Sequence, residues 1–241
     1  MIKTILAFTY VIISMIFLVP FGSVAMLIKF LGLRRLSSQI IFWIAKGWAL
    51  SVIKVTGCKT TVVGIENVPK KGGVCFISNH GSYFDIALLL AYCSRQIGFI
   101  AKKELGWIPF LNCWIYMVGG LFIDRSTVRK AFNTINKGVK MIKSGGCMII
   151  FPEGHRSKGQ GLLPFHAGSL KLATMAHAPI IPVAIDGSGD VFEKTNRVVA
   201  VPIKITFCEP IDTADIPSSD KKTILSDRIY KVISEQLQKT G

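Results

Sequence analysis

The sequence predicts an α/β fold: a largely parallel, twisted sheet of about seven strands flanked by helices, preceded by an N-terminal membrane-associating helical segment. Two observations predict it. An apolar run without charged side chains opens the chain, and after Gly57 short β-branched runs alternate with amphipathic stretches. We therefore expect a hydrophobic anchoring segment at residues 1–58 and an α/β domain at residues 59–241.

The N-terminal apolar run covers residues 4–28. As one helix, with a rise of about 1.5 Å per residue, it is long enough to cross a hydrocarbon core of about 30 Å. Pro20 and Gly22 interrupt the run, and proline favours a kink or break, so two shorter helices dipping into one leaflet are the alternative. Residues 38–55 predict a further helix with two tryptophans, a residue type that favours the boundary between water and lipid.

The charges around this run indicate its orientation. Lys29, Arg34 and Arg35 follow the run and outnumber Lys3 before it, so the positive-inside tendency places the remaining chain in the cytoplasm. A cleaved secretory signal peptide, with Lys3 as its positively charged n-region, is the other interpretation. The length of the run and the lack of a convincing cleavage site disfavour it.

Composition narrows the classes of partner. The chain has 241 residues, a formal net charge of +15 and 50% hydrophobic residues. A cationic surface suits a polyanion, and the apolar excess favours an anionic membrane surface over nucleic acid, for which no run of basic residues interleaved with aromatics is present. The six cysteines are scattered and form no CxxC pair, so we expect neither a metal site nor a disulfide framework.

The remaining elements follow from the same alternation. Apolar runs predict strands at residues 60–63, 74–78, 97–101, 121–123, 148–151, 180–185 and 203–207. Helices are expected near residues 85–94, 127–143, 169–177 and 220–238, with a cap region at 218–220. Three polar clusters come directly after apolar runs. Because ligands gather at the carboxyl ends of parallel strands, we expect these clusters to share one rim of the sheet.

The first cluster, SNHGSYFD at residues 78–85, contains His80 and Asp85. Histidine is suited to accept a proton near neutral pH, and a carboxylate on its other ring nitrogen fixes the tautomer and stabilises the imidazolium. The two side chains can meet if His80 lies in a loop and the helix begins near Ser82. The alternative is structural, because Ser82-x-x-Asp85 also fits a capping box. No G-x-S-x-G elbow or reactive-cysteine setting is present, so the hydroxyl of a substrate is the expected nucleophile.

The other clusters are suited to phosphate. GGLFIDR places Arg125 after one apolar run, and FPEGHRS places Glu153, Gly154 and Arg156 after another. Arginine binds phosphate bidentately, and Gly154 permits a turn whose backbone N–H groups could face an anion. Lys102 follows a third run. The structural alternatives are an Arg125–Asp124 ion pair, a Glu153–Arg156 pair that shapes the loop, and a solvated lysine.

These segments, in this order, resemble the glycerolipid acyltransferase family, in particular the bacterial 1-acylglycerol-3-phosphate acyltransferases. SNHGSYFD resembles the NHxxxxD block of the family, and GGLFIDR, FPEGHRS and PIIPVAI resemble its next three blocks. The resemblance covers roughly residues 59–190. Position 155 is His where the family usually has Thr, and position 166 is His where Lys is common, so the choice of acceptor is less certain than the reaction.

The resemblance implies roles for these residues. His80 would be the general base and Asp85 its orienting partner. The phosphate end of the acceptor would be bound by a second set, namely Lys102, Arg125, Glu153, Gly154 and Arg156. The implied reaction transfers a fatty acyl group from acyl-CoA or acyl carrier protein to the sn-2 hydroxyl of lysophosphatidic acid, without a metal or other cofactor. The implied location is the cytoplasmic face of a bacterial inner membrane. The alternatives are acylation of another acceptor, such as glycerol-3-phosphate or another lysophospholipid, and non-catalytic lipid binding.

Overall fold

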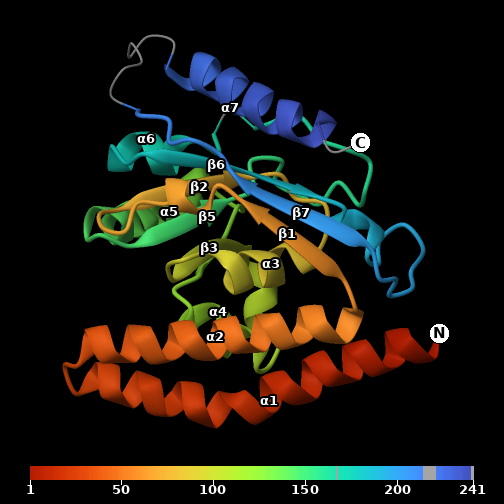
Figure 1. Ribbon diagram of the computed structural model, residues 1–241. Helices are drawn as coiled ribbons and strands as arrows, with labels where there is room; N and C mark the ends of the chain where they lie inside the picture. Colours follow the sequence, from red (N-terminus) through yellow and green to blue (C-terminus); the bar gives the residue numbers. More distant parts are fainter. Residues whose placement is uncertain (167, 214–220, 240–241) are drawn as a thin grey trace.

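The computed structural model describes residues 1–166, 168–213 and 221–239 (Figure 1). Its strands are β1 (Lys59–Val63), β2 (Val74–Ser78), β3 (Ile97–Lys102), β4 (Leu121–Ile123), β5 (Cys147–Ile150), β6 (Ile180–Asp186) and β7 (Pro202–Phe207). Its helices are α1 (Ile2–Phe30), α2 (Arg34–Thr56), α3 (Phe84–Tyr92), α4 (Leu111–Met117), α5 (Val128–Lys143), α6 (Lys171–Ala176) and α7 (Lys221–Gln238). Three 3-10 helices complete the described elements: η1 (Ile65–Asn67), η2 (Lys103–Trp107) and η3 (Ser188–Asp190).

The seven strands form one sheet in the order β1-β7-β6-β2-β5-β3-β4. Neighbouring strands are parallel except β6 and β7, which pair antiparallel. The predicted largely parallel sheet with flanking helices is confirmed. The predicted cap region at residues 218–220 lies outside the described residues.

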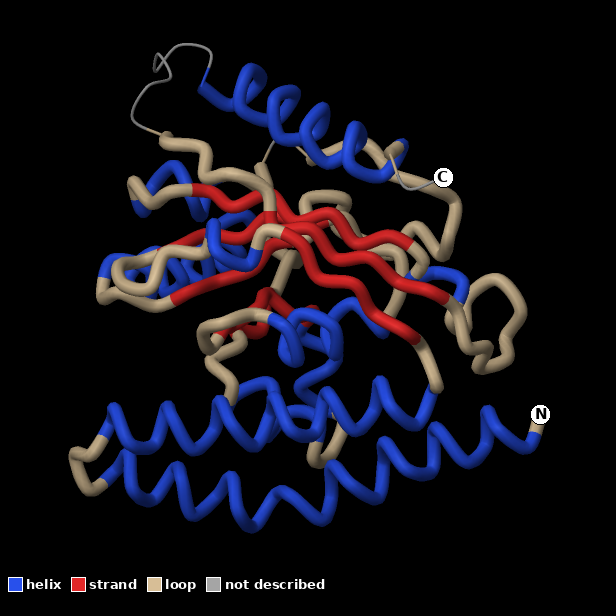
Figure 2. Tube along the Cα trace, in the orientation of Figure 1, coloured by secondary structure: helices blue, strands red, loops and turns tan. Residues whose placement is uncertain are grey.

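Two apolar layers enclose the central strands, whose side chains are buried on both faces. Alternate residues of β2, such as Phe76, pack with α2 and α3, whereas Cys75 and Ile77 pack with α5, α6 and α7. Figures 1 and 2 show the resulting layers, with the α1–α2 pair on one side of the sheet and α7 on the other. Strands buried on both faces are typical of parallel sheets covered by helices.

The N-terminal segment is a pair of long helices, and α1 continues through Pro20 without a break. Contacts on both sides of the proline explain this continuity: the Trp114 indole N–H donates to the carbonyl oxygen of Met15, and Gly22 lies against Met117. Both helices are long and apolar enough to cross a membrane by length and composition. Most side chains of α1 are exposed, however, so it is not a core helix.

The helix α1 lies along the α/β part of the chain from one end to the other. Near its start, Thr4 Oγ1 accepts from the Val198 N–H at 2.9 Å, and the Phe8 ring lies 5.1 Å from that of Phe192. Near its end, the Lys29 ammonium lies 6.0 Å from the centre of the Tyr116 ring. The run is therefore one helix held alongside the domain at both ends, and the alternative of two shorter helices interrupted at Pro20 is wrong.

Candidate active site

The site lies at the carboxyl ends of β2 and β5, where two loops are fastened to their neighbours. The Asn79 side chain accepts from the Ile185 N–H and donates to the Ile185 carbonyl, both at 2.8 Å, which ties the loop after β2 to β6. The carbonyl of His80 accepts from the Ser157 N–H at 2.8 Å, which ties the same loop to the one after β5. The predicted meeting of polar clusters on one rim therefore occurs for these two loops.

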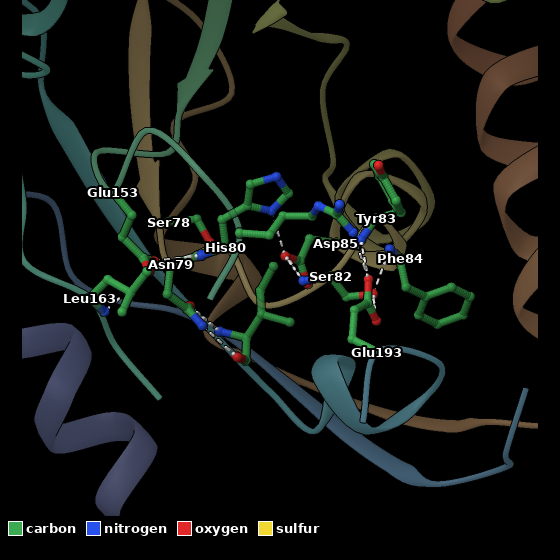
Figure 3. A network of polar contacts seen from close by, with 12 residues as sticks. Ser78, Asn79, His80, Ser82, Tyr83, Phe84, Asp85, Glu153, Leu163 and Glu193 are labelled. Carbon is green, nitrogen blue, oxygen red and sulfur yellow. Dashed lines mark hydrogen bonds and ion pairs between the residues drawn. The ribbon is translucent and has the colours of Figure 1, made fainter. Parts of the chain in front are cut away.

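His80 and Asp85 meet as predicted, with 2.8 Å between Nδ1 of His80 and Oδ2 of Asp85 (Figure 3). The same carboxylate oxygen accepts from the Ser82 N–H at 3.0 Å. The helix begins at Phe84 rather than near Ser82, and Asp85 lies fully buried in its first turn. One carboxylate oxygen thus satisfies a backbone N–H, as the capping interpretation requires, and also contacts the histidine, as the catalytic interpretation requires; the catalytic role stays a prediction.

The imidazole of His80 is held at one face and at Nδ1. Its ring stacks on Phe151 with the centroids 4.0 Å apart, and its backbone N–H donates to Glu153 Oε1 at 2.7 Å. With Nδ1 facing the carboxylate as an N–H donor, Nε2 is the nitrogen left to accept a proton. The side chain is 17% exposed, which leaves that nitrogen a route to a substrate.

Glu153 is fully buried, and backbone N–H groups engage both of its oxygens. Besides His80, it accepts from the Leu163 N–H at 3.1 Å. Burial raises the pKa of this carboxyl group to about 7, although the two N–H donors oppose the shift. Glu153 therefore fastens the loop of His80 to the segment at Leu163. No Glu153–Arg156 pair forms, because Arg156 pairs with another residue.

Arg125 and Gly154 lie beside each other. Gly154 has a φ of +74°, and a Cβ there would lie 2.9 Å from Cδ2 of His166 and 3.5 Å from Nη1 of Arg125. The position therefore requires glycine, as the predicted turn implied. Its own N–H donates to the Phe151 carbonyl, so this amide is engaged within the turn.

The predicted alternative of an Arg125–Asp124 pair is not observed. Asp124 instead pairs with Lys103 at 3.2 Å and Lys130 at 3.4 Å. Hydrogen bonds from Ser126, with Lys103 nearby, hold the pKa of the Asp124 carboxyl group well below its usual range. Arg125 is exposed and makes no ion pair with a described residue, which leaves its guanidinium able to bind an anion.

Arg156 is held by a residue that the sequence analysis missed. Its Nη1 lies 3.2 Å from Oε1 of Glu193, and its guanidinium lies 3.3 Å from the centre of the Tyr83 ring. Glu193 also accepts from the Ser82 hydroxyl at 2.7 Å and from the Tyr83 N–H at 3.0 Å. The only sequence signal was an acidic residue a few positions beyond β6, on the rim that carries His80.

Lys102 is the predicted residue that no contact brings to the site. It ends β3 with an exposed side chain that makes no hydrogen bond or ion pair with a described residue. His155 is exposed as well. Within the described ranges, no group of three or more His, Cys, Asp or Glu side chains is placed to hold a metal ion.

The arrangement can perform general-base chemistry beside an anion. Nε2 of His80 can take a proton from a hydroxyl, and the buried Asp85 stabilises the imidazolium that forms. Arg125 and Arg156 supply positive charge near the same two loops. A hydroxyl on a molecule that carries a phosphate is the kind of substrate that suits these groups.

Comparisons with known proteins identify the fold and the family. The solved structure of the 1-acyl-sn-glycerophosphate (LPA) acyltransferase PlsC from Thermotoga maritima matches with a TM-score of 0.84, over 99% of this chain and 96% of that chain, at 24% identity. At that identity the match shows the fold.

Curated relatives are each named 1-acyl-sn-glycerol-3-phosphate acyltransferase. The protein of Borreliella burgdorferi is 29% identical over 181 residues, 73% of this chain and 72% of the relative. That of Saccharomyces cerevisiae is 30% identical over 207 residues, which are 83% of this chain and 67% of the relative. That of Limnanthes douglasii is 34% identical over 166 residues, 68% of this chain but only 58% of the relative. The family model described as Acyltransferase matches residues 59–186. The chain therefore belongs to the acyltransferase family.

Proposed function

We propose that this acyltransferase moves a fatty acyl group from an acyl thioester to the sn-2 hydroxyl of 1-acylglycerol-3-phosphate, forming phosphatidic acid. The observation that carries the proposal is the 2.8 Å contact between His80 and Asp85, which leaves Nε2 of the histidine free on a rim that also carries arginines. The names of the relatives from B. burgdorferi and S. cerevisiae support the same acceptor.

The proposed reaction begins when Nε2 of His80 takes the proton of the acceptor hydroxyl. The oxygen attacks the thioester carbonyl, and the tetrahedral intermediate then expels the thiolate, which receives the proton from His80. Asp85 holds the ring and balances its transient charge. General-base help of this kind is typically worth about 10²- to 10⁴-fold in rate.

Arg125 and Arg156 would bind the phosphate of the acceptor, with Lys102 contributing charge at the edge of the site. In this account Gly154 provides the turn that lets Arg125 approach. Glu153 acts on the acceptor indirectly, by holding the His80 loop through backbone hydrogen bonds. The donor would be a thioester of CoA or of acyl carrier protein.

We place the protein at the cytoplasmic face of a bacterial inner membrane, held by residues 1–58 in one leaflet, with residues 59–241 as the acyltransferase domain. The contact between Phe8 of α1 and Phe192, next to Glu193 of the site, supports this placement because it sets the site beside the apolar helix. An acceptor lipid in that leaflet would then reach the site without leaving the membrane.

The test is an acceptor comparison with purified full-length protein in detergent–lipid micelles. Labelled oleoyl-CoA and oleoyl acyl carrier protein are offered with lysophosphatidic acid, glycerol-3-phosphate or lysophosphatidylcholine, and products are separated by chromatography. Phosphatidic acid from lysophosphatidic acid is the expected main product. Faster acylation of another acceptor, release of free fatty acid without an acceptor, or lipid binding without turnover would each refute the proposal.

A further inference from the structure

A second apolar surface lies outside the N-terminal helices, in the loop between η2 and α4. We call residues 107–110, the last residue of η2 and the loop that follows it, the aromatic loop. Trp107 is 85% exposed, and Ile108 and Phe110 are 45% and 42% exposed. Phe110 has a φ of +64°, a backbone conformation that bulky residues rarely adopt. The fold therefore holds the loop in a conformation that its sequence alone disfavours.

The aromatic loop lies next to α1. Leu111, directly after it, lines an apolar cavity together with Met15 of α1 and Trp114 of α4. The indole N–H of Trp114 donates to the Met15 carbonyl at 3.0 Å. At the end of α4, Tyr116 is exposed with the Lys29 ammonium over its ring. The exposed apolar side of α1 therefore continues onto this part of the α/β domain.

The charges beside the aromatic loop identify its partner. Lys102 and Lys103 precede it and are exposed, and Lys130 lies nearby because it shares the ion-pair partner Asp124 with Lys103. Lysines at the border of an apolar surface attract anionic lipid, and tryptophan favours the interface between headgroups and acyl chains. A second copy of this chain fits poorly, because each copy carries a net charge of +15 and would bring the same lysines together.

We propose that the aromatic loop inserts into the same anionic leaflet that receives α1, so that the catalytic domain touches lipid directly. Because the loop follows β3, at the carboxyl edge of the sheet, this contact brings the rim that bears His80 down to the headgroups. The N-terminal helices hold the protein at the membrane, and the aromatic loop sets the tilt of the domain. This inference rests on the membrane-lipid acceptor of the proposed function.

The first test is fluorescence quenching, which does not depend on turnover. Full-length protein and its Trp107→Phe variant are bound to phosphatidylglycerol–phosphatidylcholine vesicles with brominated acyl chains, and the difference spectrum isolates Trp107. Quenching of that difference by the brominated lipid, with protection from aqueous acrylamide, is expected. Quenching by acrylamide alone would overturn the proposal. A Trp107 signal that neither quencher reduces but that changes with protein concentration would also overturn it, because it indicates self-association.

The second test compares acceptors. A Trp107→Glu, Phe110→Asn double variant should raise the KM for lysophosphatidic acid in vesicles at least tenfold. Its KM for a short-chain, water-soluble lysophosphatidic acid should change less than twofold. The control variant Ile224→Glu alters an exposed residue on α7, on the other side of the sheet, and should change neither KM. Unchanged KM on vesicles, or an equal loss on both acceptors, contradicts the proposal. If wild type acylates no acceptor, the proposed function fails while quenching still decides the insertion.

Discussion

Replacement of Asp85 by Asn separates the two roles that one carboxylate oxygen combines. Oδ2 accepts from His80 Nδ1 and from the Ser82 N–H, whereas the buried Oδ1 has no hydrogen-bond partner among the described residues. If the amide oxygen of Asn takes the place of Oδ2, its NH₂ group occupies the buried position without an acceptor. An unpaired buried donor costs about 1–3 kcal/mol, which should lower the thermal midpoint.

The opposite orientation of the introduced amide is no better. Its NH₂ group would face the Ser82 N–H, and it would donate to Nδ1 of His80, which moves the imidazole proton to Nε2 and blocks the base. In either orientation the negative charge beside the imidazolium is lost. We expect kcat/KM to fall by about 10²- to 10⁴-fold, equivalent to roughly 3–5 kcal/mol of transition-state stabilisation.

The assay measures acyl transfer to lysophosphatidic acid and thermal unfolding in the same detergent, so that activity can be corrected for the folded fraction. An Asp85→Asn protein that is less stable but retains more than a tenth of wild-type kcat/KM would refute the reasoning. That result would leave Asp85 as a helix cap with no part in orienting or charging His80.

Three further predictions concern the surrounding loops. Glu193→Ala should lower kcat/KM at least tenfold by releasing the Ser82 hydroxyl and Tyr83 N–H. Glu193→Gln should restore most of it, because its amide oxygen can accept from the Tyr83 N–H while its NH₂ donates to the Ser82 hydroxyl oxygen; equal losses of kcat/KM in the two variants would count against this. Burial raises the pKa of Glu153 from its ordinary value of 4.5 to about 7, so the folded protein favours the neutral carboxyl group. The resulting contribution to stability, at most roughly 3 kcal/mol, is fully present below pH 4.5 and is lost as pH rises through 7. Thermal midpoints from pH 5 to 8 should therefore fall more steeply for wild type than for Glu153→Gln, and parallel curves would disprove the assignment. His155→Thr should stay within about twofold of wild-type turnover, since the side chain is exposed; complete inactivation would show a role in the reaction.

Much of the fold could be predicted because the central strands are short, apolar and clearly bounded. The run VCFIS becomes β2, and the polar residues after it form the site loop as expected. The placement of β7 between β1 and β6, parallel to β1 and antiparallel to β6, could not be predicted, since apolar patterning does not encode which strands pair. The short helix α4 was missed because LNCWIYM is only seven residues long, although Leu111, Trp114 and Ile115 have helical spacing, and it packs against α1.

The site was predictable where chemistry and local spacing coincide, as in the contact between His80 and Asp85. The partnership of Arg156 with Glu193 joins residues far apart in the sequence, and no local pattern announces it. Glu153 shows a second limit of sequence reasoning. A carboxylate that faces a ligand and one that accepts backbone N–H groups in the interior have the same sequence signature, and burial alone distinguishes them.

The role of His80 as the base that activates a lipid hydroxyl underlies the proposed function. Its most direct test is acyl transfer from oleoyl-CoA to lysophosphatidic acid by wild type and His80→Ala, purified and assayed side by side with their folding checked by thermal unfolding. We expect phosphatidic acid from wild type and a rate at least about 10²-fold lower from the variant. A folded His80→Ala protein that forms phosphatidic acid at a rate close to wild type would contradict it.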